Sequence, residues 1–238
     1  MTVSDRFESG ALDAVLFDAG GTLVRLDYEL MARCAVRCGA RITSEDLHLA
    51  EARARGEIDR RARAAGGVLD SDAERVQDYF ETLLAYAGAP AAAVRSAGSL
   101  LRAEHARRNL WRVACDGARE TLRGIRGRGL RVAVVSNADG RVEDILHALD
   151  LRRHLDLVVD SHHEGVEKPD PEIFRRALDR LDVPADRAAY VGDIYSIDAL
   201  GARAAGLYPV IVDATQTYRG HDCETIADLR QLIARLGS

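Results

Sequence analysis

Lysine is nearly absent from this sequence. Of the 33 lysine and arginine residues, Lys168 alone is a lysine. An ammonium group is a compact charge with three donors and fits a single oxygen in a tight site, whereas the guanidinium fork needs more room. A chain that uses arginine elsewhere keeps lysine where arginine does not fit, although a single lysine also arises by chance. The position of Lys168 is therefore informative only if other segments indicate the same chemistry.

Long apolar runs, paired cysteines and basic stripes are also missing. No window approaches the roughly 18 apolar residues that a membrane span needs. The net charge of −5 is spread over both halves of the chain, which argues against a nucleic-acid partner. Residues 1–10 carry three charges and no apolar run, unlike a signal peptide, and the four cysteines form no CxxC pair. We therefore expect a cytoplasmic protein without a membrane span, and the sequence favours no particular oligomeric state.

Apolar runs and amphipathic stretches alternate through most of the chain. The apolar runs cover residues 14–17, 130–135, 157–159, 188–191 and 209–212. The amphipathic stretches cover residues 117–126, 141–149, 171–181, 197–205 and 225–236. This alternation predicts βαβ units, that is, an α/β fold with a doubly wound parallel sheet covered on both faces. Asp116 and Asp170 are the expected N-caps of two of the helices, and Pro171 follows Asp170 at the first helical position.

One long segment interrupts this alternation after the first apolar run. Residues 25–112 show helical patterns at 28–38, 44–65, 72–87 and 91–109, with no strand pattern. We therefore predict a core domain made of residues 1–24 and 113–238, and an all-helical domain made of residues 25–112. A helical insertion after the first strand indicates a lid, which would exclude water and select substrates.

Polar residues stand where the predicted strands end. Asp18 follows the first apolar run, Ser136 and Asn137 follow the second, and Asp193 follows the run at 188–191. In open α/β sheets, ligands bind outside the carboxyl ends of the strands. These residues, together with Lys168, are therefore expected to converge on one crevice despite their separation in sequence.

The combination of these segments resembles four motifs of the haloacid dehalogenase-like hydrolase superfamily. The motifs are Asp18-Ala19-Gly20-Gly21-Thr22 after the first strand, Ser136 after the second, Lys168-Pro169, and Gly192-Asp193 followed five residues later by Asp198. Each is weak alone, but their order and spacing together are specific. The resemblance spans the whole chain and implies a Rossmann-like core, an inserted helical cap and an active site between them.

The resemblance assigns a role to each matched residue. Asp18 would be the nucleophile that attacks phosphorus and forms an aspartyl-phosphate. Thr22, Ser136 and Asn137 would bind the phosphoryl oxygens of a small phosphorylated substrate, and Lys168 would neutralise the charge shared by nucleophile and phosphate. Without the resemblance, an aspartate or hydroxyl after a strand is as often a simple helix or turn cap.

The resemblance also implies a magnesium cofactor. Asp18, the main-chain carbonyl of Gly20 and Asp193 would be its protein ligands, and Asp198 would orient its neighbours. Oxygen ligation completed by water and substrate is what Mg²⁺ prefers.

The sequence departs from the family pattern at Gly20. Phosphatases of the superfamily usually carry a second aspartate there as general acid and base, and such catalysis is typically worth ~10²–10⁴ in rate. Asp27, Tyr28, Glu29 and His48 lie nearby in sequence or in the insertion, and we interpret each as an ordinary exposed residue.

The departure keeps two other functions open. Dehalogenases of the superfamily also lack the second aspartate, but they typically carry tyrosine at the Gly20 position and lose the metal-binding acid, whereas Asp193 is present here. A weakly active or non-catalytic protein that binds phosphate or a partner is the second alternative. Phosphonatases are disfavoured because they use a cap lysine, and residues 25–112 contain none.

Overall fold

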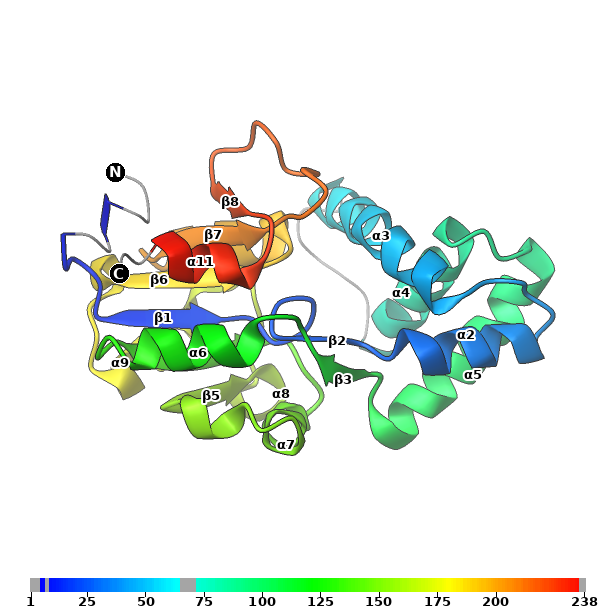
Figure 1. Ribbon diagram of the computed structural model, residues 1–238, viewed down its shortest axis with the longest axis horizontal. Helices are drawn as coiled ribbons and strands as arrows, with labels where there is room; N and C mark the ends of the chain where they lie inside the picture. The colour runs from blue at the N-terminus through cyan, green and yellow to red at the C-terminus, as the bar shows by residue number, and fades with distance from the viewer. Residues whose placement is uncertain (1–4, 7–8, 65–71, 236–238) are drawn as a thin grey trace. The chain divides into compact units, whose positions relative to one another are not determined.

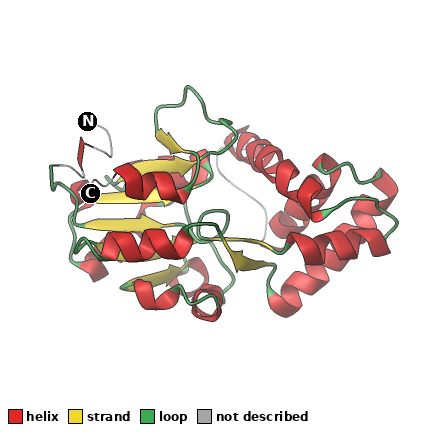
Figure 2. Ribbon diagram, in the orientation of Figure 1, coloured by secondary structure: helices red, strands yellow, loops and turns green. Residues whose placement is uncertain are grey.

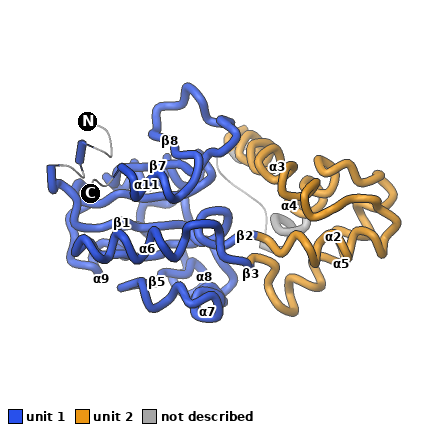
Figure 3. Tube along the Cα trace, viewed as in Figure 1, with its two compact units in different colours: residues 1–25, 112–238 blue, residues 26–111 orange. Residues whose placement is uncertain are grey.

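The chain forms two compact units. The computed structural model describes residues 5–6, 9–64 and 72–235. Unit 1 comprises Met1–Arg25 and Arg112–Ser238, and unit 2 comprises Leu26–Trp111 (Figure 3). Among the described residues, no helix is both long and apolar enough to cross a membrane. That unit 2 acts as a cap stays a prediction.

Unit 1 is built on a six-stranded parallel sheet with the order β5-β4-β1-β6-β7-β8 (Figure 1). The strands are β1 (Ala14–Phe17), β4 (Arg131–Ser136), β5 (Leu157–Asp160), β6 (Ala188–Gly192), β7 (Tyr208–Val212) and β8 (Glu224–Ile226). The β1 side chains are fully buried, as expected for a strand covered on both faces. The predicted α/β fold with a parallel sheet is confirmed.

Helices cover both faces of this sheet, as Figure 2 shows. They are α6 (Ala118–Arg126), α7 (Val142–Ala148), α8 (Ser161–Glu164), α9 (Pro171–Leu181), α10 (Leu200–Ala204) and α11 (Leu229–Arg235). The helix α9 packs Phe174 and Leu178 against Leu16 and Tyr190 on one face of the sheet. On the other face, α6 and α11 lie beside each other (Figure 1).

Of the two predicted N-caps, Asp170 is confirmed and Asp116 is wrong. The Asp170 carboxylate accepts a hydrogen bond from the Glu172 N–H at 2.9 Å, with Pro171 in the first turn, as predicted. The predicted Asp116 cap is wrong, because Gly117 occupies the N-cap of α6 with a positive φ of 78°. A left-handed residue suits glycine, and its backbone alone opens the helix.

Residues 225–235, the described part of the predicted helix 225–236, are not one helix, contrary to the sequence pattern. Residues 224–226 form the edge strand β8, and α11 begins only at Leu229. The Asp213 N–H donates to the Ile226 carbonyl at 2.8 Å, so pairing to β7 overrides the helical pattern there.

Unit 2 consists of α2 (Tyr28–Arg37), α3 (Ser44–Ala64), α4 (Asp72–Tyr86) and α5 (Ala91–Arg108). Predicted helix residue 65 lies outside the described residues. The prediction of helix without any strand is wrong at the ends of this segment: β2 (Val24–Leu26) and β3 (Trp111–Ala114) pair in a two-stranded sheet. Strands of three and four residues are too short for alternation to reveal them.

The core of unit 2 contains a buried carboxylate, Glu51. Glu51 of α3 is 6% exposed, and it accepts hydrogen bonds from the hydroxyls of Tyr28 on α2 and Tyr79 on α4. Tyr28 is therefore buried, and its interpretation as an exposed residue is wrong. Its ring packs inward because α2 turns that face toward α3 and α5.

Candidate functional site

Three of the predicted site residues lie at the ends of three adjacent strands. Asp18 directly follows β1, Ser136 ends β4, and Asp193 directly follows β6. The strands β4 and β6 flank β1 on either side, and the Asp18 N–H donates to the Val191 carbonyl at 2.8 Å. The strand order changes direction at β1, so this edge is where an α/β sheet binds its ligands.

Asp18 is held at one of its two carboxylate oxygens. Its Oδ1 accepts a hydrogen bond from Ser136 Oγ at 3.0 Å and another from Lys168 Nζ at 2.7 Å. Both of these hydrogen bonds reach Oδ1, and none is found to Oδ2 within the described residues. Burial raises the pKa of the Asp18 carboxyl more than the charge of Lys168 lowers it. The site therefore holds a desolvated carboxylate that has one oxygen left for a ligand.

The Lys168 ammonium lies against three acceptors of unit 1. These are Asp18 Oδ1 at 2.7 Å, Asp198 Oδ1 at 2.7 Å and Tyr190 Oη at 2.8 Å. Burial alone lowers the pKa of Lys168, but the charges of Asp18 and Asp198 outweigh it and raise that pKa above its usual value. The ammonium therefore stays charged, and it compensates the nearby carboxylates.

Asn137 fixes the main chain of the lysine. Its Nδ2 donates to the Lys168 carbonyl at 2.9 Å, and its Oδ1 accepts from the Lys168 N–H at 2.8 Å. Two bonds of this kind mimic a strand pairing and set the position of the Lys168 loop. This is a positioning role that the sequence did not indicate, and the predicted phosphate contact of Asn137 stays a prediction.

Asp198 ties together the turn that follows β6. The turn is π-helical over Tyr195–Ala199. The Asp198 Oδ2 accepts the N–H groups of Asp193 at 3.0 Å and Ile194 at 2.9 Å, while its Oδ1 faces Lys168. A Cβ on Gly192 would lie 2.3 Å from the Asp198 carboxyl carbon, so only glycine fits there. Both oxygens of Asp198 are thus engaged in holding its neighbours in place.

Asp18, Asp193 and Asp198 form a buried acidic cluster. Each offers an oxygen within 4.8 Å of the others. Three carboxylates face a single ammonium in this cluster, and uncompensated buried charge is unfavourable. A hard cation with oxygen ligands matches this set of donors. Asp198 is already engaged at both oxygens, so it is less suited to bind a cation than its position in the cluster alone would indicate.

Thr22 presents an unsatisfied hydroxyl in the loop between β1 and β2. Its Oγ1 is buried and has no hydrogen-bond partner within the described residues. Gly21 has a positive φ of 78°, which allows the tight turn that brings the Thr22 main chain round. Buried hydroxyls are normally satisfied, so this one is available to an acceptor that a ligand brings.

Gly20 adopts an ordinary backbone conformation. It is bridged to Val24 and, unlike Gly21, does not have a positive φ. A side chain at this position therefore needs no left-handed backbone.

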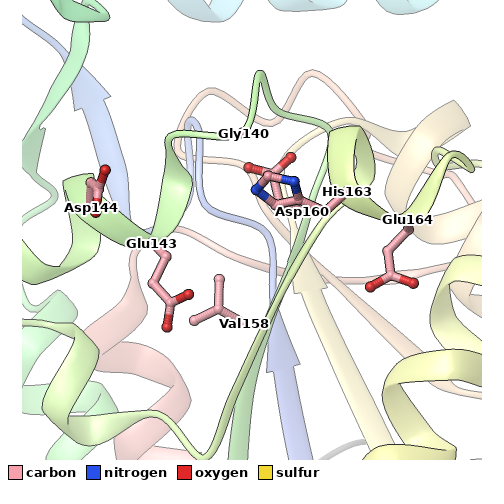
Figure 4. A pocket seen from close by; sticks show the side chains of 7 residues that line it. All are labelled: Gly140, Glu143, Asp144, Val158, Asp160, His163 and Glu164. Atoms are coloured by element: carbon pink, nitrogen blue, oxygen red, sulfur yellow. The ribbon is translucent and has the colours of Figure 1, made fainter.

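A cavity of about 240 Å³ lies elsewhere on unit 1 (Figure 4). Its lining is mostly acidic and consists of Gly140, Glu143, Asp144, Val158, Asp160, His163 and Glu164. Glu164 pairs with Arg176 and Arg180, and the Asp160 carboxylate caps α8. None of the predicted site residues lines this cavity.

Tyr190 is the site residue that the sequence did not indicate. It stands inside β6, where the other residues are alanine, valine and glycine. One polar ring in an otherwise small apolar strand is the only signal it leaves. Burial and the charges of Asp198 and Asp18 raise its pKa well above the usual value, so the phenol stays protonated.

Comparison with known families identifies the chain. The family model described as haloacid dehalogenase-like hydrolase matches residues 12–206. The chain belongs to the haloacid dehalogenase-like hydrolases. This membership confirms the resemblance drawn from the four motifs, and residues 12–206 contain all of the predicted site residues.

Two relatives match about half of the chain in sequence. Over 106 residues, the chain is 49% identical to haloacid dehalogenase-like hydrolase domain-containing protein 3 of Mus musculus, covering 44% of this chain and 42% of that protein. It is 41% identical over 107 residues to phosphoserine phosphatase of Thermus thermophilus, covering 44% and 42%. These matches span less than half of either relative.

The fold of the whole chain resembles that of the magnesium-bound HAD-hydrolase YfnB of Bacillus subtilis. The TM-score is 0.68 at 22% identity, over 95% of this chain and 99% of that one. At this level of identity the likeness concerns the fold.

Proposed function

We propose that this protein is a magnesium-dependent phosphatase that hydrolyses small phosphorylated metabolites through an aspartyl-phosphate on Asp18. One observation carries the proposal: Lys168 and Ser136 hold the buried Asp18 at Oδ1, while no residue that the structure describes forms a hydrogen bond to Oδ2. Phosphatases among the relatives, such as the phosphoserine phosphatase of Thermus thermophilus, support the choice of reaction.

The reaction has two steps at Asp18. A carboxylate oxygen attacks phosphorus, the bond from phosphorus to the ester oxygen breaks, and the leaving oxygen takes the electron pair and then a proton from solvent. Water next attacks the aspartyl-phosphate and gives up a proton to solvent, the bond from phosphorus to the Asp18 oxygen breaks with its electron pair returning to the carboxylate, and inorganic phosphate leaves. Lys168 compensates the carboxylate in both steps, because its ammonium lies 2.7 Å from Asp18 Oδ1.

The phosphoryl oxygens need donors, and two hydroxyls supply them. Thr22 Oγ1 is buried and has no partner among the residues that the structure describes, so binding a phosphoryl oxygen satisfies it at no loss of another bond there. Ser136 donates to Asp18 in the described structure and lies beside the attacking group. Donors that are fixed before the substrate arrives stabilise the transition state without reorganisation.

Magnesium fits the acidic cluster. Asp18 and Asp193, with the main-chain carbonyl of Gly20, would hold the ion. When bound, Mg²⁺ neutralises charge that develops on the phosphoryl oxygens. Asp198 keeps the Asp193 main chain in place through the two N–H groups that it accepts.

Gly20 limits the range of leaving groups. Without a carboxylate at this position, the leaving oxygen lacks the usual proton donor of the family. Acyl and aryl phosphates, which depart with little proton transfer, should therefore turn over faster than alkyl phosphates.

The proposal is tested with a substrate panel. Purified protein is assayed against alkyl, aryl and acyl phosphates and against 2-haloacids, with Mg²⁺ and with EDTA. We expect phosphate release that needs Mg²⁺, and calorimetry should detect Mg²⁺ binding that weakens in Asp193→Asn. Metal-independent halide release would instead identify a dehalogenase, and Mg²⁺ binding without any turnover would identify a non-catalytic protein.

A further inference from the structure

The hydroxyl of Tyr190 is buried at the centre of the lysine site. Tyr190 lies in the central strand β6 with no exposed surface, and Phe174 of α9 packs edge-on against its ring at 4.9 Å. Its Oη lies 2.8 Å from Lys168 Nζ, 2.8 Å from the Val135 carbonyl and 3.3 Å from Asp198 Oδ1. The ring is thus fixed by packing, and the hydroxyl has little freedom to move.

The donors and acceptors around Lys168 match in number. An ammonium has three hydrogens, and the three oxygens near Nζ belong to Asp18, Asp198 and Tyr190. The Tyr190 hydroxyl can give its own hydrogen to the Val135 carbonyl and keep a lone pair for the ammonium. Every hydrogen of the ammonium therefore has a protein acceptor, and a substrate oxygen could bind there only by displacing one of them.

We propose that Tyr190 is a positioning residue that orients the Lys168 ammonium, so that its other two hydrogens point at Asp18 and Asp198. Lys168 then acts on the nucleophile and on the turn that carries Asp193, while substrate binding falls to other groups. The kinetic consequence rests on the proposed function, but the orientation of the ammonium does not. A buried tyrosine that merely fills the core would share the packing and would not control the lysine.

The single lysine makes a direct test possible. Protein prepared without added lysines and labelled with ε-¹⁵N-lysine gives one ammonium signal by NMR. In the wild-type protein we expect slow exchange of the ammonium hydrogens with water, because all three are bound. Tyr190→Phe should shift the ¹⁵N signal and speed the exchange by about tenfold or more.

Tyr208→Phe is the matched control. Tyr208 begins the neighbouring strand β7, and its ring lies 5.0 Å from the Arg6 guanidinium. This variant removes a phenol hydroxyl from the same sheet and should leave the lysine signal unchanged. An unchanged signal in Tyr190→Phe would overturn the proposal. So would ammonium exchange in the wild-type protein as fast as in free lysine, which can be measured even if the variant does not fold.

Kinetics test the consequence for turnover. In folded Tyr190→Phe, kcat should fall about tenfold while KM stays within about twofold, since Tyr190 orients a group that acts on the nucleophile. A wild-type kcat alongside an altered lysine signal would overturn the catalytic part. If the wild-type protein releases no phosphate from any substrate, the proposed function fails, and the NMR experiment still decides the role of Tyr190.

Discussion

Glu51 of unit 2 and Asp18 of unit 1 are both buried carboxylates, but their hydrogen-bond surroundings differ. In unit 2, Glu51 has a hydroxyl donor at each of its two oxygens, from Tyr28 and Tyr79. In unit 1, Asp18 has two donors on one oxygen and, among the described residues, none on the other, and two further carboxylates lie close by. Both centres are almost fully buried, since Glu51 is 6% exposed and Asp18 is 7% exposed.

The two carboxylates are buried to a similar extent, and they differ in how many of their hydrogen-bonding positions are occupied. The Glu51 centre satisfies its own polar atoms, so it can contribute to stability without any ligand. In unit 1, the Thr22 hydroxyl has no hydrogen-bond partner within the described residues, and three carboxylates lie within 4.8 Å of one another, two of them bound to the Lys168 ammonium. Unsatisfied hydroxyls and closely spaced carboxylates destabilise the folded protein, and a ligand that supplies the missing hydrogen-bond acceptor or positive charge removes this cost. Function is therefore better indicated by unmet hydrogen bonds and charge than by burial.

Replacing each carboxylate by its amide should have the largest effects, on turnover at Asp18 and on stability at Glu51. Asp18→Asn should lower phosphate release by at least about 10³-fold, because the amide is a poor nucleophile. Glu51→Gln should leave the turnover of the folded protein in place but reduce the free energy of unfolding by about 1–3 kcal/mol, because one tyrosine hydroxyl loses its acceptor. Steady-state kinetics and urea unfolding measure the two effects.

Either variant could contradict the role proposed for its carboxylate. Turnover in Asp18→Asn equal to that of the wild-type protein would remove Asp18 as the nucleophile. A Glu51→Gln variant of undiminished stability would show that the tyrosine hydroxyls do not depend on this carboxylate. Circular dichroism of both variants establishes that the loss in Asp18→Asn is chemical and not a loss of fold.

The sequence predicts the positions of the site residues better than their contacts. Asp18 and Asp193 could be placed because they follow continuous apolar runs, and parallel strands end at one edge of the sheet. Lys168 could be singled out because no other lysine exists. Periodicity does not predict the direction in which the side chain of Tyr190 or Asn137 points. This direction depends on the pleat of the strand and on hydrogen-bond partners from distant segments.

The wrong predictions have the same origin. Residues 224–226 carry a helical pattern but pair with β7, and Tyr28 is buried because α2 packs against α3 and α5. At Gly117 a backbone conformation opens the helix where the side chain of Asp116 was expected to do so. In the first two cases tertiary contacts outweigh a local preference, and in the third the left-handed backbone of a glycine replaces the side-chain cap.

The substitution Gly20→Asp adds the carboxylate that phosphatases of the family usually carry near the nucleophile. Gly20 has no positive φ, so Gly20→Asp needs no unusual backbone. The new acid should raise the hydrolysis of alkyl phosphates, by at most ~10²–10⁴ and less in an unadapted site, while aryl and acyl phosphates gain less. Rates for the three classes of ester are compared at saturating Mg²⁺.

The outcome for Gly20→Asp separates the remaining functions. Flat rates on alkyl phosphates, in a variant that folds and binds Mg²⁺, would favour a dehalogenase-like or non-catalytic protein. A gain confined to alkyl phosphates would mean that the wild-type protein works without the usual proton donor of its family.

The smallest expected effect concerns the lone lysine. Lys168→Arg keeps the charge, but the guanidinium is larger than an ammonium and must fit among oxygens of Asp18, Asp198 and Tyr190 that now lie 2.7–2.8 Å from Nζ. One of these groups should be displaced, and kcat/KM should fall by at least about tenfold, or ~1.4 kcal/mol of transition-state stabilisation. The reverse exchange at the surface, Arg131→Lys, is the matched control, because the Arg131 side chain is 61% exposed and its charge is weakly held. Equal kcat/KM for Lys168→Arg and wild type would mean that the site tolerates either cation, and the one lysine in this chain would then be a matter of composition.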